Sequence, residues 1–121
     1  MANTFNVVTF AAEPASAGTA YKMYTVAGST TTVVLGLVLT NIHSSAVTAE
    51  VELVSDTGSR GGANNVTNGT SFLVKDENIP AGSSLEVLTG GKVVMETTDY
   101  LNIDCSVADK LSGTLSIMEI T

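Results

Sequence analysis

Alternation of apolar and polar residues dominates this chain, and a period of two is typical of β-strands that bury one face. The two clearest examples are residues 47–54 and 101–107. Weaker alternation recurs in segments bounded by Gly, Pro, Asn, Asp or Ser, namely residues 4–10, 20–25, 71–75, 84–88, 92–97 and 114–120. With an apolar run at residues 31–42, the pattern predicts about eight or nine short strands and almost no helix.

The run at residues 31–42 is apolar on both of its faces. This predicts a central strand that the opposite sheet covers on one side and a neighbouring subunit covers on the other. Gly36 within the run indicates a β-bulge or the close approach of another backbone. Gly90 and Gly91 predict a tight turn, and hence a hairpin over residues 84–97. We expect further turns at residues 80–82 and 108–110.

These elements together predict an all-β fold, a single domain over residues 1–121 built as an antiparallel β-sandwich of the jelly-roll type. Residues 56–70 interrupt the pattern, because they contain four Gly and three Asn and have almost nothing to bury. We expect a long exposed loop there, where a partner would bind. Its candidate contact residues are Arg60, Asn64, Asn65 and Asn68.

Charge and composition narrow the possible functions. The 121 residues include 5 Lys and Arg against 12 Asp and Glu, a net charge of −7, and the basic residues are scattered singly. This argues against a groove that binds nucleic acid. The longest apolar run has about half the residues that a membrane-spanning helix needs. Residues 1–10 do not resemble a secretory signal, so we expect a soluble protein made in a reducing compartment.

Candidate chemistry is sparse. His43 is the single histidine and follows a predicted strand, which favours a solvated turn residue. Cys105 is the single cysteine and falls on a predicted inward face, where it would be a small core residue. Carboxylates at residues 76–77 and 96–104 match no calcium-loop spacing and are interpreted as solvated turn acids. We therefore predict no catalytic, cofactor-binding or metal-binding residue, no cofactor and no enzymatic activity.

Several strand and turn motifs carry a family resemblance. They lie at residues 72–76, 79–88, 91–96, 99–101 and 115–120, with residues 24–26 and 31–41 in the first half. In these motifs the chain resembles a family of small virion proteins of tailed phages, many of them phages of marine bacteria. The resemblance implies a virion component without catalytic residues. In such relatives the loop at residues 56–70 is shorter, so here it would be an insertion.

The leading functional hypothesis is a capsid decoration (cement) protein that binds between major capsid subunits and holds the shell against internal DNA pressure. It would be made in the cytoplasm of the host bacterium, assemble as a homo-oligomer, with a trimer favoured, and reside in the virion. Its partners would be the major capsid protein or other virion proteins, with no nucleic acid and no membrane. The candidate residues for self-association or capsid contact are Phe5, Val7, Phe10, Val33, Leu35, Leu37 and Leu39.

Two alternatives remain open. The same fold could form a neck or tail ring, or a fibre component, of the virion. A function of a different class would be a module that binds a host glycan or a host protein. Glycan binding usually needs exposed aromatic rings to stack on sugars, and the chain has no Trp and three Tyr. This composition disfavours the module.

Overall fold

The computed structural model describes residues 2–55 and 69–121. Within them, the chain forms nine β-strands and no helix, which confirms the all-β prediction. The strands are β1 (Asn3–Glu13), β2 (Tyr21–Thr25), β3 (Thr31–Asn41), β4 (Val47–Val54), β5 (Thr70–Ile79), β6 (Ser84–Glu86), β7 (Val93–Met95), β8 (Tyr100–Cys105) and β9 (Leu111–Ile120).

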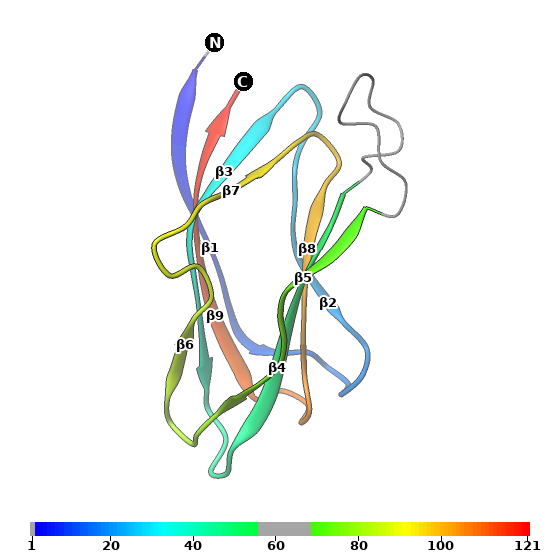
Figure 1. Cartoon of the computed structure of the whole chain (residues 1–121), viewed down its shortest axis with the longest axis vertical. Helices are drawn as coiled ribbons and strands as arrows, with labels where there is room; N and C mark the ends of the chain where they lie inside the picture. The colour runs from blue at the N-terminus through cyan, green and yellow to red at the C-terminus, as the bar shows by residue number, and fades with distance from the viewer. Residues whose placement is uncertain (1, 56–68) are drawn as a thin grey trace.

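The strands form two sheets that pack face to face. One is five-stranded, in the order β1-β9-β3-β6, with β7 also pairing with β3. The other is four-stranded, in the order β2-β8-β4-β5. Figure 1 shows the first sheet on the left and the second on the right. All the strand pairings are antiparallel, so the predicted antiparallel β-sandwich is confirmed.

The connectivity follows the jelly-roll pattern. β6 and β7 pair with different parts of β3, so they act together as one interrupted strand. The two halves of the chain then pair as a long hairpin: β1 with β9, β2 with β8, β3 with β6 and β7, and β4 with β5. Folding this hairpin over itself places β9 beside β3 and β8 beside β4, which creates the two sheets.

The predicted hairpin over residues 84–97 is wrong. β6 and β7 do not pair with each other, because each lies against the long edge of β3. Gly90 has a positive φ of 73°, as a tight turn requires, but the segment between the strands leaves the edge of β3 and returns to it. The turn at residues 80–82 is confirmed, since the Ser83 amide donates to the Pro80 carbonyl at 3.0 Å. A turn also occupies residues 108–109.

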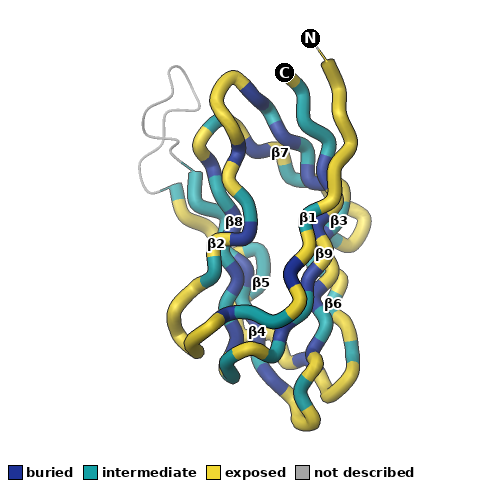
Figure 2. The backbone as a smooth tube through the Cα atoms, turned by 180° about the vertical axis from the view of Figure 1, so that it is seen from behind, coloured by how far each residue is buried: buried dark blue, intermediate teal, exposed yellow. Residues whose placement is uncertain are grey.

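The core lies between the two sheets and is built from inward residues of nearly every strand. Figure 2 shows the buried segments alternating with more exposed ones along the strands, as a period of two requires. Cys105 is 3% exposed and belongs to this core, as predicted. The largest fully buried apolar side chains include Leu37, Leu39, Ile79, Met95, Leu101, Ile103, Leu111, Leu115 and Ile117.

A β-bulge in β3 changes which of its apolar residues face the core. The register between β3 and β9 shifts between Val34 and Gly36, as Gly36 had indicated. Val34 and Leu37 are therefore both buried, although strict alternation would place them on opposite faces. Leu35 stays on the outside of the sheet and is 36% exposed. The bulge thus changes which apolar residues enter the core.

Asn41, at the end of β3, is a fully buried polar residue that joins two turns. Its Nδ2 donates to the carbonyls of Ser45 and Ile79, each at 2.9 Å. Its Oδ1 accepts from the His43 amide at 2.7 Å. Because every polar atom of this amide has a partner, its burial is compensated. The side chain fixes the connection between β3 and β4 against the end of β5.

Replacing Asn41 with Ala should therefore destabilise the protein. The substitution removes the buried bond to the Ile79 carbonyl and the partly buried bonds to the Ser45 carbonyl and the His43 amide, at an expected cost of about 2–4 kcal/mol. Denaturant unfolding followed by circular dichroism measures this change. Asn78→Ala is the control, because Asn78 is exposed on β5 and its loss should change the stability by less than about 0.5 kcal/mol. Equal stabilities of the two variants would contradict this role.

The absence of a side chain at Gly113 leaves space in the core for the Phe10 ring. The two residues are paired between β1 and β9, and a Cβ built on Gly113 would overlap the ring. The ring also packs edge-on against Tyr21 of the other sheet, with centroids 5.4 Å apart and an interplanar angle of 64°. The missing side chain at Gly113 thus lets β1 contact the four-stranded sheet.

We predict that Gly113→Ala costs about 1–3 kcal/mol of unfolding free energy, because the added methyl forces the Phe10 ring from its site. Gly36→Ala on the same sheet is the matched control, since a Cβ there has nothing within 4 Å. In a Phe10→Ala background the cost of Gly113→Ala should largely disappear. Equal costs in both backgrounds, measured by thermal or denaturant unfolding, would show that the ring is not the cause.

Candidate functional site

Four apolar residues form a row across the outer face of the five-stranded sheet. Phe5 of β1 lies opposite Met118 of β9. Met118 in turn lies opposite Val33 of β3, and Val33 lies opposite Val94 of β7. Residues directly opposite one another in antiparallel strands point to the same face. The inward neighbours Val34 and Ile117 are buried, so this row faces outward.

The row belongs to a larger exposed apolar surface. Phe5 is 71% exposed, Val7 63% and Val94 60%, which is unusual for large apolar side chains that share one face. By register, the outward residues of β1, β9, β3 and β7 include no charged side chain. Glu86 of β6 lies at the border. We call this surface the outer apolar face, and it comprises Phe5, Val7, Val33, Leu35, Val38, Val94 and Met118.

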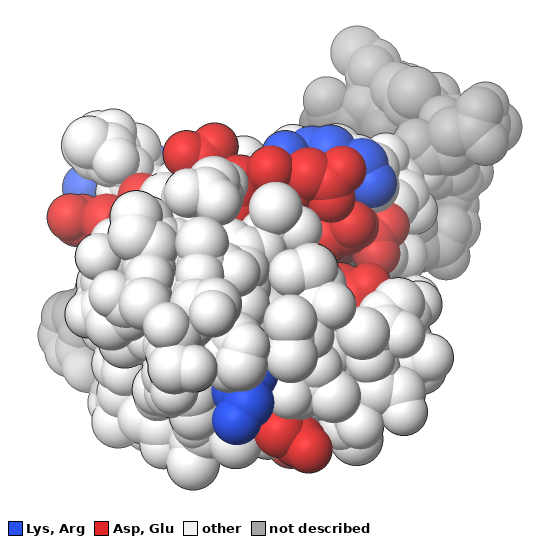
Figure 3. Space-filling model, turned by 90° about the horizontal axis from the view of Figure 1, so that it is seen from below, with Lys and Arg blue, Asp and Glu red and all other residues white. Residues whose placement is uncertain are grey.

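The outward face of the four-stranded sheet has the opposite character. Glu50 and Asp104 lie opposite each other on β4 and β8, and Glu52 follows Glu50 on the same face. Lys22 lies over the ring of Tyr100, 4.0 Å from its centroid. Figure 3 shows acidic side chains gathered in one region of the surface seen from below, while most of the remaining visible surface is uncharged. The two broad faces of the sandwich therefore differ sharply in charge.

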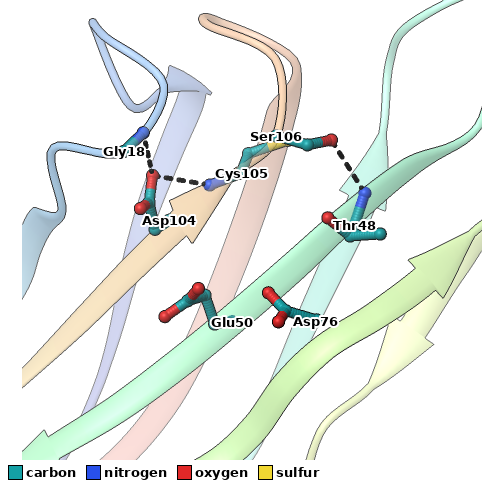
Figure 4. Close-up of a pocket in the computed structure, with 7 residues that line it drawn as sticks. All are labelled: Gly18, Thr48, Glu50, Asp76, Asp104, Cys105 and Ser106. Atoms are coloured by element: carbon teal, nitrogen blue, oxygen red, sulfur yellow. Dashed lines mark hydrogen bonds between the residues drawn. The ribbon is translucent and has the colours of Figure 1, made fainter.

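A shallow pocket of about 200 Å³ opens on this acidic face. Figure 4 shows three carboxylates along it, from Glu50, Asp76 and Asp104. Asp104 Oδ1 already accepts from the backbone amides of Cys105 at 2.8 Å and Gly18 at 3.2 Å. The remaining lining residues are Thr48, whose amide donates to Ser106 Oγ at 3.0 Å, and Ser106 itself.

The carboxylates of this pocket are engaged in structural contacts. Lys75 Nζ lies 3.3 Å from Glu50 Oε1 and 3.9 Å from Asp76 Oδ2. The bond from the Gly18 amide to Asp104 holds the connection between β1 and β2 against β8. Over residues 2–55 and 69–121, no group of three or more His, Cys, Asp or Glu is arranged to hold a metal ion. Those residues also include no helix with the length and apolar character to cross a membrane.

A polar network joins the two sheets behind the outer apolar face. Tyr24 Oη of β2 lies 2.7 Å from Thr32 Oγ1 of β3 and donates to Glu119 Oε2 of β9 at 2.8 Å. Glu119 also accepts from Asn6 Nδ2 of β1. Burial raises the pKa of Tyr24 to about 12, with the hydrogen bond to Glu119 and its negative charge acting in the same direction. The Thr32 hydroxyl has the opposite effect on this pKa.

The raised pKa of Tyr24 predicts a loss of stability at high pH. The folded protein holds the phenol proton more tightly than the unfolded chain, whose Tyr pKa is 10.0. The stabilisation is therefore complete below about pH 10 and is lost as the pH rises toward about 12. Denaturant unfolding of the wild type and Tyr24→Phe across this window measures the effect. The same pH dependence in both proteins would contradict it.

The structure separates the predicted contact residues into two groups. Phe5, Val7, Val33 and Leu35 lie on the outer apolar face. Three others are inside the sandwich and cannot form an external contact, which corrects their prediction: Phe10, Leu37 and Leu39. Phe10 faces inward because it pairs with Gly113, and the bulge in β3 turns the other two into the core.

Other predicted residues fall elsewhere. Arg60, Asn64, Asn65 and Asn68 lie outside the described residues. His43 is in the connection between β3 and β4, as predicted, and is partly buried.

The sequence reasoning missed three members of the outer apolar face. Val38, Val94 and Met118 belong to it through their register with neighbouring strands. The sequence signal for an outward Val94 was its position beside Val93. Adjacent residues in a strand point to opposite faces, so one of these two valines had to face outward.

Comparison with models of protein families, with curated proteins and with solved structures gave no match.

Proposed function

We propose that this chain is a non-enzymatic structural protein of a tailed-phage virion, and that it decorates the capsid as a cement protein. It would contact the major capsid protein or another virion protein and assemble with further copies of itself. The virion assignment rests on the resemblance in the strand and turn motifs. The outer apolar face is the structural observation that supports an assembly function.

The outer apolar face is suited to lasting contact with another protein. It is an uncharged surface on a pleated sheet whose opposite side is the core of the sandwich, so its shape is held by packing. Covering it would gain about 25 cal/mol for each Å² of apolar surface removed from water. Interfaces that persist are enriched in such surfaces and poor in charge at their centre.

The acidic face gives a reason for a fixed orientation on the shell. With a net charge of −7 and carboxylates gathered on the four-stranded sheet, bound copies would repel one another if those faces met. An arrangement with the outer apolar face buried and the acidic face in solvent avoids this repulsion. In the proposed assembly, the five-stranded sheet therefore faces the capsid or its neighbours.

A charge on the outer apolar face should weaken capsid binding. We expect Val94→Glu to reduce the amount bound to expanded capsids of the encoding phage, because it places a charge at a desolvated contact. Phe72→Glu is the matched control, since Phe72 is 47% exposed on the other sheet and should tolerate the same change. Cosedimentation with the capsids measures both variants. Equal loss in both, or no binding by the wild type, would contradict the proposal.

Copy number separates the alternatives. A cement protein is expected to be present in proportion to the capsid subunits, whereas a neck or tail ring needs far fewer copies, and quantitative mass spectrometry of purified virions distinguishes the two. A host-glycan module should instead bind cells. The three tyrosines that could stack on a sugar, Tyr21, Tyr24 and Tyr100, are all partly buried, so none of them offers this alternative a fully exposed ring.

A further inference from the structure

Among the strands of residues 2–55 and 69–121, the sandwich has sheet edges at four places, and three of them carry features that block pairing with another chain. β2 is five residues long, contains Lys22 and has an irregular register. β5 carries Lys75, Asp76 and Glu77 together with register shifts. β6 and β7 are three residues each. Short strands, charges and bulges are the means by which proteins protect their edges.

The fourth edge, β1, lacks these features over residues 3–10. This stretch contains no charged residue and no Pro, and its register with β9 is continuous. The first charge, Glu13, comes after the register shift that follows Phe10. Figure 2 shows the N-terminal part of β1 exposed along its length, and residues 3–7 are all exposed. A long, uncharged and regular edge is a template for pairing with another strand.

The hydrogen bonds at the start of β1 fix which groups face the free edge. The amide and carbonyl of Ala2 are both bonded to Thr121, at 3.1 and 3.0 Å. In an antiparallel ladder such pairs alternate with pairs that make no hydrogen bonds. Asn3, Phe5, Val7 and Thr9 therefore direct their main-chain N–H and C=O groups away from β9. The side chains of these same residues point to the outer face.

We propose that β1 pairs with β1 of a second copy of this chain, antiparallel and around a twofold axis at Asn6. In this register Phe5 lies opposite Val7 of the other copy, and Asn3 lies opposite Thr9. Every one of these residues has its main-chain groups on the free edge, so each pair exchanges two hydrogen bonds. The two five-stranded sheets become one continuous sheet.

Charge and side-chain pattern single out a second copy as the partner. The chain is strongly acidic, yet the paired stretch is uncharged, so no like charges lie opposite each other in the new ladder. Glu13 falls beyond the paired stretch. Because the twofold axis passes between the two copies of Asn6, each outward residue of one β1 lies opposite an outward residue of the other. The outer faces of both copies are therefore on the same side of the joined sheet. Phe5 and Val7 of the two copies then join both outer apolar faces into one.

The pairing adds detail to the proposed function, and the role of the pairing in the virion rests on that function. It assigns β1 to self-association and leaves the rest of the outer apolar face to the shell. It also yields a dimer in place of the trimer that we expected from the sequence, because two antiparallel copies of one edge close on themselves.

Light scattering and sedimentation equilibrium on the full chain test the pairing. The wild type should be a dimer. Val7→Lys should raise the dimer dissociation constant by about tenfold or more, whereas Val94→Lys should leave it unchanged. The two valines are a matched pair, 63% and 60% exposed on the same face. Val7→Pro is a second variant that should weaken the dimer and leave the pairing of β1 with β9 intact, because the lost N–H faces the free edge and not β9.

Cysteine cross-linking tests the register. Asn6→Cys should form a disulfide between copies, since residues on the axis lie about 4.5 Å apart between Cα atoms in a pair without hydrogen bonds. Asn3→Cys is the control, because its two copies would be roughly 20 Å apart along the strands. The native Cys105 is buried and does not compete.

A monomeric or trimeric wild type would overturn the pairing. Equal weakening by Val7→Lys and Val94→Lys would also overturn it, because that result indicates packing between outer faces instead of edges. Cross-linking of Asn3→Cys as efficient as that of Asn6→Cys would reject the register. Failure of the proposed function gives a different result. If the protein is a dimer with all these properties but does not bind capsids, the pairing is upheld and the decoration role is rejected.

Discussion

The pairing of β3 with β9 is the contact on which the rest of the sandwich depends. It brings residues from the first and last thirds of the chain into one ladder, interrupted by the bulge in β3, from Thr31 opposite Ile120 to Asn41 opposite Leu111. β1 attaches to the free side of β9, and β6 and β7 attach to the free side of β3. The inward residues of the pair, among them Leu37 and Leu115, supply much of the core. Burial of this ladder thus fixes the whole five-stranded sheet.

Period-two alternation predicted the strands well, because a strand that buries one face must alternate. The predictions failed where the deciding contact is distant in sequence. Gly90 and Gly91 predicted a hairpin, but β6 and β7 each pair with the long strand β3 and not with each other. Residues 31–42 correctly indicated a central strand, yet which of its leucines are buried depends on the bulge against β9.

The candidate surface was predicted in part for the same reason. Val7 and Val8 are adjacent and equally apolar, so the sequence cannot say which of them enters the core. Register with β9 settles the question: Phe10 pairs with Gly113 and faces inward, which leaves Phe5 and Val7 outside. The charge contrast between the two faces was equally hidden, since the acids of β4 and β8 meet only after the sheet forms.

The same residues of β1 supply both the main-chain edge and side chains of the outer apolar face, so in the proposed function they would link self-association to decoration. Two chains paired at β1 would present their apolar faces side by side on one continuous sheet. In the proposed assembly, a shell would bind such a pair through two connected surfaces, so each one could be weak on its own while the pair is held by their high effective concentration. An unprotected edge is an aggregation hazard in a free protein. Under the proposed function, the β1 edge would instead be a contact site that pairing with a second copy closes.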